Sequence, residues 1–102
     1  MKERSNVPLT GKQRRHLRAL GHHLEPVVIV GQAGVTEGVI AAVEQALQDH
    51  ELIKVKINEG PETRQEGAQR IAEGAQAELA QLLGRTALLF KKRKKDSKFE
   101  KF

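Results

Sequence analysis

The stretch Leu52-Ile-Lys-Val-Lys-Ile57 is the clearest strand signal in the chain and decides its fold class. Every second residue from Ile53 to Ile57 is apolar, and Lys54 and Lys56 lie between them. Because successive side chains of a strand point to opposite faces, such a strand has one apolar face and one basic face. The sequence therefore predicts a sheet that buries one side of this strand and leaves two lysines on the other.

Further strands are predicted on both sides of this one. Upstream, Pro26-Val-Val-Ile-Val30 is rich in β-branched residues and bounded by proline and glycine, which predicts a buried strand. Downstream, Arg85-Thr-Ala-Leu-Leu-Phe90 predicts another strand. Residues 98–102 fit either a short last strand or an irregular tail, and the sequence leaves both open.

Three helices are predicted between the strands. Thr10-Gly-Lys-Gln13 has the pattern of a capping box, and the helix that it opens is expected to end at Gly21. A second helix is expected to start at Thr36, and a third to run from about Glu62 to Leu83. The apolar residues that support these two helices recur at helical spacing, and they are Val39, Ile40, Val43 and Leu47, then Ala68, Ile71, Ala72, Ala75, Leu79 and Leu82.

The order of elements predicts an α/β fold in a single domain. An N-terminal helix is followed by β-α-β-α-β, with one more strand if the C-terminal residues pair, and this alternation implies a mixed three- to four-stranded sheet packed with helices. A chain of 102 residues has room for one such domain. We assign residues 8–91 to the domain and residues 92–102 to a basic C-terminal tail.

Charge is unevenly distributed along the chain. Residues 1–24 carry six Lys or Arg and one acid, residues 25–84 carry four and ten, and residues 85–102 carry eight and two. Strongly basic segments usually meet a polyanion, although they also occur as solvated tails. The charge thus predicts contact with nucleic acid, and for the run Lys91–Lys95 charge is the sole argument.

Two elements are candidates for gripping a phosphate backbone. On the first helix, Leu17 and Leu20 form an apolar stripe, and the opposite stripe is basic and consists of Lys12, Arg14, Arg15 and Arg18. The second element is the loop Gly31-Gln-Ala-Gly34 between a strand and a helix start, where backbone N–H groups and the helix dipole favour anions. We expect the helix and the loop to lie side by side as one RNA-binding face, with Lys54, Lys56 and the basic tail as candidates for extending it.

The glycine loop also fits a plain strand-to-helix turn that needs glycine torsions, and Glu37 behind it would repel a phosphate. Its spacing matches neither a Walker phosphate loop nor the dinucleotide fingerprint, so we expect no nucleotide cofactor.

The composition argues against catalysis and against a metal site. The chain has no cysteine, its histidines do not converge, and its serines, Ser5 and Ser97, lie near the two ends. We expect no catalytic residues, no metal, no cofactor and no small-molecule substrate. No apolar run approaches the roughly 20 residues of a membrane helix, so we expect a cytoplasmic monomer that does not contact the membrane. With no Trp or Tyr and three Phe, we expect recognition of structured RNA by phosphate and shape.

Three blocks of the sequence resemble a known family. They are Leu9-Thr-Gly-Lys-Gln-Arg-Arg-His-Leu-Arg-Ala-Leu20, Pro26-Val-Val-Ile-Val-Gly-Gln-Ala-Gly34 and Glu51-Leu-Ile-Lys-Val-Lys56. In this order they are similar to the CRM (chloroplast RNA splicing and ribosome maturation) domain, in particular to its stand-alone bacterial members, over about residues 8–91.

The resemblance implies a fold similar to the C-terminal domain of bacterial initiation factor three, with a mixed four-stranded sheet. It also implies RNA binding and association with precursors of the large ribosomal subunit. The family's GxxG loop falls on Gly31, Gln32, Ala33 and Gly34, and its basic helix on Lys12, Arg14, Arg15 and Arg18. The loop interior is Gln-Ala where many relatives carry a lysine, which shifts our expectation toward the helix as the main anchor.

The resulting hypothesis is an RNA-binding protein that assists ribosome assembly by binding structured ribosomal RNA. An alternative is a protein-interaction adaptor that docks the acidic third helix and touches nucleic acid only incidentally. A DNA-binding protein is a further alternative, although the first helix does not open a helix-turn-helix, because a strand follows Gly21.

Overall fold

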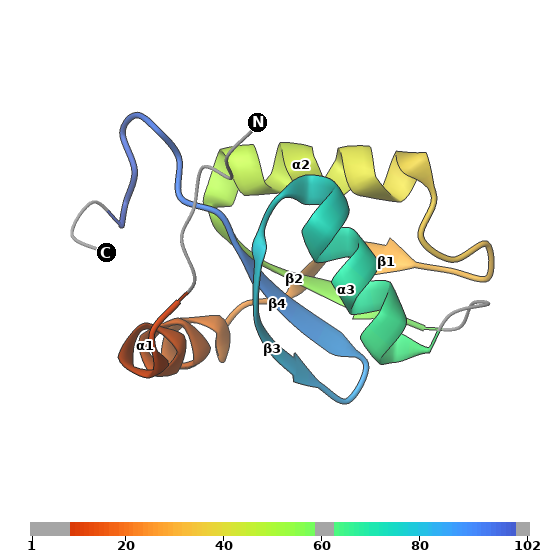
Figure 1. The fold of residues 1–102 in the computed structure, drawn as a ribbon, viewed down its shortest axis with the longest axis horizontal. Helices are drawn as coiled ribbons and strands as arrows, with labels where there is room; N and C mark the ends of the chain where they lie inside the picture. Colours follow the sequence, from red (N-terminus) through yellow and green to blue (C-terminus); the bar gives the residue numbers. More distant parts are fainter. Residues whose placement is uncertain (1–8, 59–62, 100–102) are drawn as a thin grey trace.

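Three helices and four strands follow one another in the computed structural model, which describes residues 9–58 and 63–99 (Figure 1). Their bounds are α1 Gly11–Gly21, β1 Pro26–Val30, α2 Glu37–His50, β2 Leu52–Ile57, α3 Arg64–Ala75, β3 Glu78–Leu83 and β4 Thr86–Phe90. Within these described residues, no helix is both long and apolar enough to cross a membrane.

The strands form one mixed sheet of four in the order β1-β2-β4-β3. β1 and β2 run parallel and are joined by the crossover helix α2, as a parallel pair requires. β4 lies between β2 and β3 and is antiparallel to both. The predicted α/β class with a mixed sheet is therefore confirmed.

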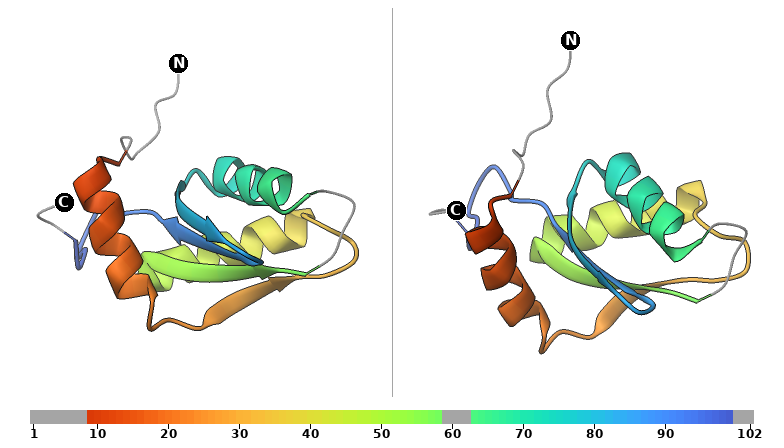
Figure 2. Two further views of the ribbon diagram at one scale, coloured as in Figure 1. Left: turned by 90° about the horizontal axis from the view of Figure 1, so that it is seen from below. Right: turned by 60° about the horizontal axis from the view of Figure 1, so that its bottom comes forward.

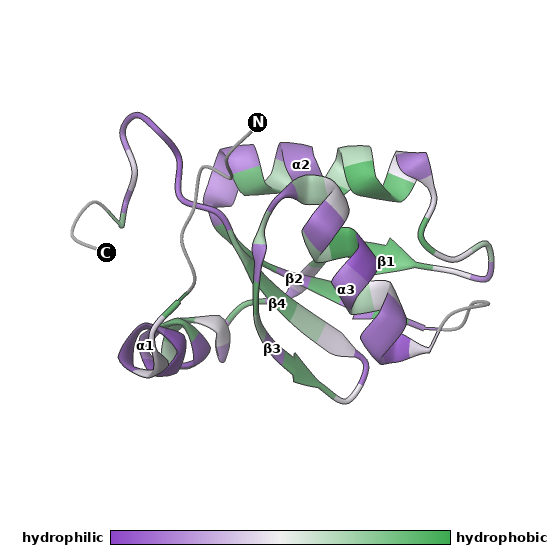
Figure 3. Ribbon diagram, in the orientation of Figure 1, coloured by the Kyte–Doolittle hydropathy of each residue, from purple (hydrophilic) through white to green (hydrophobic). Residues whose placement is uncertain are grey.

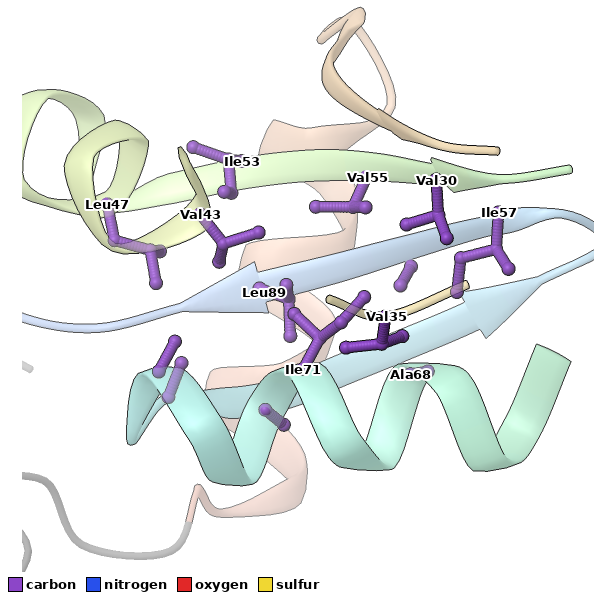
Figure 4. Close-up of a cluster of buried hydrophobic side chains, with 14 residues drawn as sticks. Val30, Val35, Val43, Leu47, Ile53, Val55, Ile57, Ala68, Ile71 and Leu89 are labelled. Carbon is purple, nitrogen blue, oxygen red and sulfur yellow. The ribbon is translucent and has the colours of Figure 1, made fainter. Parts of the chain in front are cut away.

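The main core lies on the face of the sheet that α2 and α3 cover (Figure 4). Ile53, Val55 and Ile57 of β2 all belong to it, as the alternation predicts. Its other buried members are Val30, Val35, Val43, Leu47, Ala68, Ile71, Ala72, Ala75, Ala77, Ala87 and Leu89. Figure 3 shows mainly apolar strands beside helices of mixed character, which is typical of a sheet covered by amphipathic helices.

The opposite face of the sheet is only partly covered, by α1. A second cluster of buried residues there contains Leu17 from α1 with Leu52, Ala80, Leu88 and Phe90 from the sheet. The end of α1 approaches very closely, because a Cβ at Gly21 would lie 2.6 Å from Leu88 Cδ1. The helix ends at Gly21 as expected, and the glycine permits this close approach, while the cap residue His22 is right-handed with φ of −55°.

The predicted helix from Glu62 to Leu83 is wrong in its second half. α3 ends at Ala75, where Gln76 takes the left-handed conformation with φ of 55°, and β3 follows. β3 carries a register shift between Leu79 and Gln81. The shift lets Leu79 and Leu82, three residues apart, both pack against the main core, which reproduces the spacing of a helix.

Two other strand predictions also need correction. β1 is an edge strand and not a buried one, since the side chains of Val27 and Ile29 are 52% and 61% exposed. In the possible last strand over residues 98–102, Lys98 and Phe99 form a turn. The other residues of that segment lie outside the part of the chain that the structure describes.

Candidate nucleic-acid interface

α1 begins with the predicted capping box. The Thr10 hydroxyl accepts a hydrogen bond from the Gln13 backbone N–H at 3.1 Å, and the Gln13 side-chain oxygen accepts one from the Thr10 N–H at 2.9 Å. These bonds satisfy N–H groups that a helix start leaves without intrahelical partners. The first residue of α1 is thereby fixed, and so is the direction of every basic side chain that follows.

Arg14 does not join the outward stripe, and this part of the prediction is wrong. Its Nη1 donates to the backbone oxygens of Leu79 at 2.7 Å and Ala80 at 3.5 Å, at the register shift of the edge strand β3. An edge strand with a bulge has carbonyl groups that the ladder does not pair, and the guanidinium satisfies them. The sheet-facing side of α1 is therefore formed by Arg14, Leu17 and Gly21, while Leu20 is 41% exposed.

Three cations remain on the outer side of α1. Lys12, Arg15 and Arg18 are all exposed and recur every third residue. Residues three apart lie on neighbouring positions of one helix face, so the three form a row along the helix. This row is the most concentrated exposed positive charge on any described helix.

A second row of side chains crosses the half of the sheet that α1 leaves uncovered. In the strand pairing, Ile29, Lys56, Thr86 and Leu83 lie opposite one another in turn, so one residue of each strand forms a line across the sheet. Lys56 is exposed at its centre, and Ile29 and Leu83 at its ends are 61% and 69% exposed. We call these four residues the open sheet row.

A groove connects α1 with this sheet face. It has a volume of about 420 Å³ and is lined by Arg18 and His22 from α1 and its cap, and by Lys54, Gln81 and Thr86 from three strands. Arg18 and Lys54 thus face one space from opposite walls. The groove thus brings together one predicted helix cation, Arg18, and one predicted strand cation, Lys54, whereas Lys56 does not line it.

The glycine loop lies elsewhere, so the expectation that it adjoins α1 is wrong. α1 leads into the first residue of β1 and the loop follows its last, and all views place them at opposite ends of the molecule (Figures 1 and 2). The strand between them spans roughly 13 Å at 3.3 Å per residue. The uncovered sheet face, with Lys56, lies between the two.

The loop itself is a tight turn. The Gly34 N–H donates to the Gly31 oxygen at 3.1 Å, and Gly34 has φ of 80°, which favours glycine. Gln32 and Ala33 at its tip are exposed. Thr36 caps α2 by accepting from the Val39 N–H, so the helix start is already partly satisfied. The turn geometry thus accounts for Gly34, whereas a Cβ at Gly31 would meet only open space.

A larger cleft than this groove has a different character. It has a volume of about 950 Å³ and lies between α1, the start of β1, the end of α2 and residues 97–99. Leu20, Leu24, Val27 and Phe99 give it largely apolar walls, which do not suit a phosphate. Over the described ranges, no three His, Cys, Asp or Glu side chains are grouped so that they could hold a metal ion.

Glu51 is a structurally important residue that the sequence does not single out. It is the one charged residue buried among those that the structure describes, and it contacts residues 93–98 of the basic tail. The missed β3 hairpin did leave a signal, since Gly84-Arg85 between two apolar runs is a two-residue hairpin loop. Glu51 left no comparable signal, because its partners are more than 40 residues away.

Comparison with known proteins gives consistent results. Residues 9–91 match the CRS1 / YhbY (CRM) domain family. A protein of Pseudomonas aeruginosa named as a probable RNA-binding protein is 41% identical over 93 residues, which cover 90% of this chain and 89% of that one. An RNA-binding protein of Haemophilus influenzae is 43% identical over 84 residues, covering 81% and 85% of the two chains.

Similarity extends to an archaeal relative and to a solved structure. A probable RNA-binding protein of Methanocaldococcus jannaschii is 42% identical over 96 residues, covering 91% of this chain and 71% of that one. The solution structure of a hypothetical protein from Staphylococcus aureus superposes with a TM-score of 0.75 and 33% identity, covering 87% of this chain and 94% of that one.

Proposed function

Because the chain belongs to the CRS1 / YhbY (CRM) domain family, we propose that it is an RNA-binding protein that grips structured ribosomal RNA by its phosphates. We further propose that it associates with precursors of the large ribosomal subunit and assists their assembly. It has no catalytic role in this proposal, and its site of action is the cytoplasm.

The observation that carries the proposal is the continuity of positive charge from α1 to the sheet. Arg18, at the end of the exposed row Lys12, Arg15 and Arg18, lines a groove whose sheet wall holds Lys54. Lys56 lies two residues further along the same strand, on the open sheet row. Cations from two elements can thus contact successive phosphates of one backbone. Phosphate contacts of this kind give affinity without reading base sequence.

The aromatic residues support recognition by phosphate and shape. Proteins that read unpaired bases usually stack them on exposed rings. Phe90 is buried in the second cluster, as expected from the sequence, and Phe99 packs against it with ring centroids 5.0 Å apart. Phe90 is thus unavailable for stacking and Phe99 is partly buried against it, while Phe102 lies outside the described residues.

The glycine loop takes a secondary part in the proposal. Its exposed tip lies beyond the far end of the open sheet face, so an RNA helix that contacts α1 and Lys56 would continue toward the loop. Without a cation at the tip and with Glu37 exposed nearby, the loop positions the RNA through its backbone and adds little charge.

The adaptor alternative is not favoured by the geometry of the acidic residues. The predicted third helix contains four acids, Glu62, Glu66, Glu73 and Glu78. Glu78 belongs to β3, and the carboxylate of Glu66 accepts the Thr63 N–H in a capping box. Glu62 lies outside the described residues, which leaves Glu73 as the exposed acid of α3 without a capping role.

Two experiments test the proposal. Crosslinking in cells, followed by sequencing of the bound RNA, is expected to enrich large-subunit ribosomal RNA. In vitro, the affinity for a labelled helical fragment of that RNA is expected to fall about 10³–10⁵-fold between 50 and 200 mM salt if six to ten phosphates are contacted. Reads spread over messenger RNA alone would overturn the assembly role. Binding that ignores salt, or that an excess of duplex DNA abolishes, would overturn the phosphate grip on RNA.

A further inference from the structure

Glu51 is a fully buried carboxylate that binds the basic tail. It follows the last residue of α2, has φ of 68°, and its side chain is 0% exposed. Oε2 accepts hydrogen bonds from the Arg93 N–H at 2.8 Å and from the Ser97 hydroxyl at 2.5 Å, and Oε1 accepts the Lys98 N–H at 2.8 Å. A buried charge is costly unless it is paired, and here every donor found among the described residues comes from the tail.

The ionised form of Glu51 is favoured by these contacts. Burial by itself raises the pKa of the carboxyl, but the hydrogen bonds from Arg93, Ser97 and Lys98 and the nearby Arg93 guanidinium outweigh it, so the pKa is lowered. The Arg93 Nη2 lies 3.7 Å from Oε1. Glu51 is therefore a fixed anion that holds the tail in one path.

Two of the five consecutive bases point inward and act as structural contacts. Lys91 Nζ donates to the Ala75 oxygen at 3.1 Å, at the end of α3. Arg93 Nη1 donates to the oxygens of Gln48 and Asp49 at 2.9 and 3.2 Å, at the end of α2. Cations at helix C-termini satisfy free carbonyls and the negative end of the dipole. The run is thus not a uniform charged tail.

The inward contacts leave a defined set of exposed cations. Lys94, Lys95 and Lys98 are exposed, and the bend between them is held by the Arg93 Nη2 bond to the Asp96 oxygen at 2.9 Å. At its far end, the segment is anchored by Phe99, whose ring meets Phe90 edge to face. A loop fixed at both ends loses little conformational entropy when it binds a ligand.

This segment lies beside α1. Phe99 and Leu17 belong to one apolar cluster, and residues 97–99 share the large cleft with His16 of α1. In all views the segment and α1 occupy the same end of the molecule (Figures 1 and 2). Lys98, which lines this cleft with His16, thus adds an exposed cation beside α1.

We propose that Lys91–Phe99 is a second phosphate-binding element, which we call the arm. Glu51 holds the arm against the domain so that Lys94, Lys95 and Lys98 contact the RNA backbone. The inference rests on the proposed RNA binding and deepens it. We choose RNA over an anionic membrane because the apolar anchor that a membrane would need, Phe99, is partly buried and packs its ring against Phe90 of the second cluster.

The first test removes the exposed charges. The double variant Lys94→Ala with Lys95→Ala is compared with wild type in a salt titration of binding to the labelled helical fragment of ribosomal RNA. Loss of two phosphate contacts is expected to lower the slope of log affinity against log salt by about 1.4–1.8. If the lines converge at 1 M salt, affinity at 0.1 M falls about 25- to 60-fold. Arg64→Ala, which removes an exposed charge at the start of α3, is the control and leaves the slope unchanged.

The second test separates the positioning role of Glu51, whose hydrogen bonds to residues 93–98 we call the clamp, from the charge of the lysines. In Glu51→Gln, the amide NH₂ must face the N–H of either Arg93 or Lys98, so one hydrogen bond becomes a clash between donors. Amide exchange of residues 91–99 is expected to accelerate and the salt slope to fall, although every lysine is retained. Glu44→Gln, at an exposed position of α2, changes neither.

The outcomes distinguish the two proposals. If wild type does not bind the RNA fragment, the proposed function fails. If wild type binds it and the double lysine variant keeps both affinity and slope, the arm proposal alone fails. An arm variant that loses binding to phosphatidylserine vesicles but not to RNA would also overturn it. A Glu51→Gln variant with faster exchange in the arm and an unchanged slope would overturn the positioning role.

Discussion

Arg14 and Arg15 are neighbours in the chain, and the structure predicts that replacing each of them by alanine changes a different property of the protein. Arg14→Ala removes the hydrogen bonds from its guanidinium to the carbonyls of Leu79 and Ala80, at 2.7 and 3.5 Å. Arg15 is exposed, and no hydrogen bond from its side chain is found among the described residues. Arg14→Ala therefore changes stability, whereas Arg15→Ala changes RNA binding.

The expected magnitudes follow from the geometry. A hydrogen bond to a charged group contributes about 1.5–3 kcal/mol, and partial exposure of Arg14 reduces this to about 1–2 kcal/mol of unfolding free energy. In a domain of this size, each kcal/mol lowers Tm by roughly 4–8 °C. Arg15→Ala is expected to stay within about 0.5 kcal/mol of wild type, as exposed substitutions usually do. It lowers the salt slope of RNA binding by about 0.7–0.9, one phosphate contact.

The assay combines urea unfolding followed by circular dichroism with the salt titration of RNA binding, on both single variants and the double variant. Because the two arginines act on different properties, their effects are expected to add in the double variant. The assignment of roles is refuted if Arg14→Ala unfolds at the wild-type urea concentration, or if Arg15→Ala destabilises the domain by as much as Arg14→Ala.

Three further predictions concern the core, the clamp and the sheet. Gly21→Ala places a Cβ 2.6 Å from Leu88 Cδ1 and is expected to cost about 1–3 kcal/mol by overpacking, whereas Gly11→Ala, with open space at its Cβ, serves as the tolerated control in urea unfolding. Since the pKa of Glu51 is lowered from 4.5, its stabilisation is complete above that value and is lost as the pH falls through the lowered pKa. In an acid titration followed by NMR, the amides of residues 91–99 are expected to lose protection against hydrogen exchange before the rest of the domain does, and an arm that stays protected at low pH would contradict this. Lys56→Ala is expected to weaken RNA binding through the salt slope while leaving unfolding by urea unchanged, and a loss of stability instead would remove it from the interface.

Local signals predicted the elements whose side chains obey one simple periodicity. The alternation of β2 gave the correct core face, and the capping box at Thr10 gave the correct start of α1. β3 could not be predicted in the same way, because its register shift places Leu79 and Leu82 on one face at helical spacing. A bulge depends on the partner strand, and the sequence of one strand does not contain it.

In the candidate site, too, local sequence patterns predict some features, whereas others depend on residues that are distant in the chain. The exposed cations Lys12, Arg15 and Arg18 follow from helical projection, but the inward turn of Arg14 depends on carbonyls 65 residues away. The separation of the glycine loop from α1 depends on where β1 enters the sheet. Glu51 has an ordinary acidic side chain whose importance appears only when residues 93–98 fold back onto it.

The clamp at Glu51 also bears on the order in which the chain acquires structure during synthesis. A growing chain that has just completed α2 and β2 contains the carboxylate but none of the three donors that bind it, since these lie 42 to 47 residues further on. The central strand β4 is likewise made after its neighbour β2. Until residue 98 has emerged, Glu51 must remain hydrated, so the end of α2 stays open to water. The last bonds of the domain close only when its basic segment arrives, which couples completion of the fold to completion of the proposed RNA-binding surface.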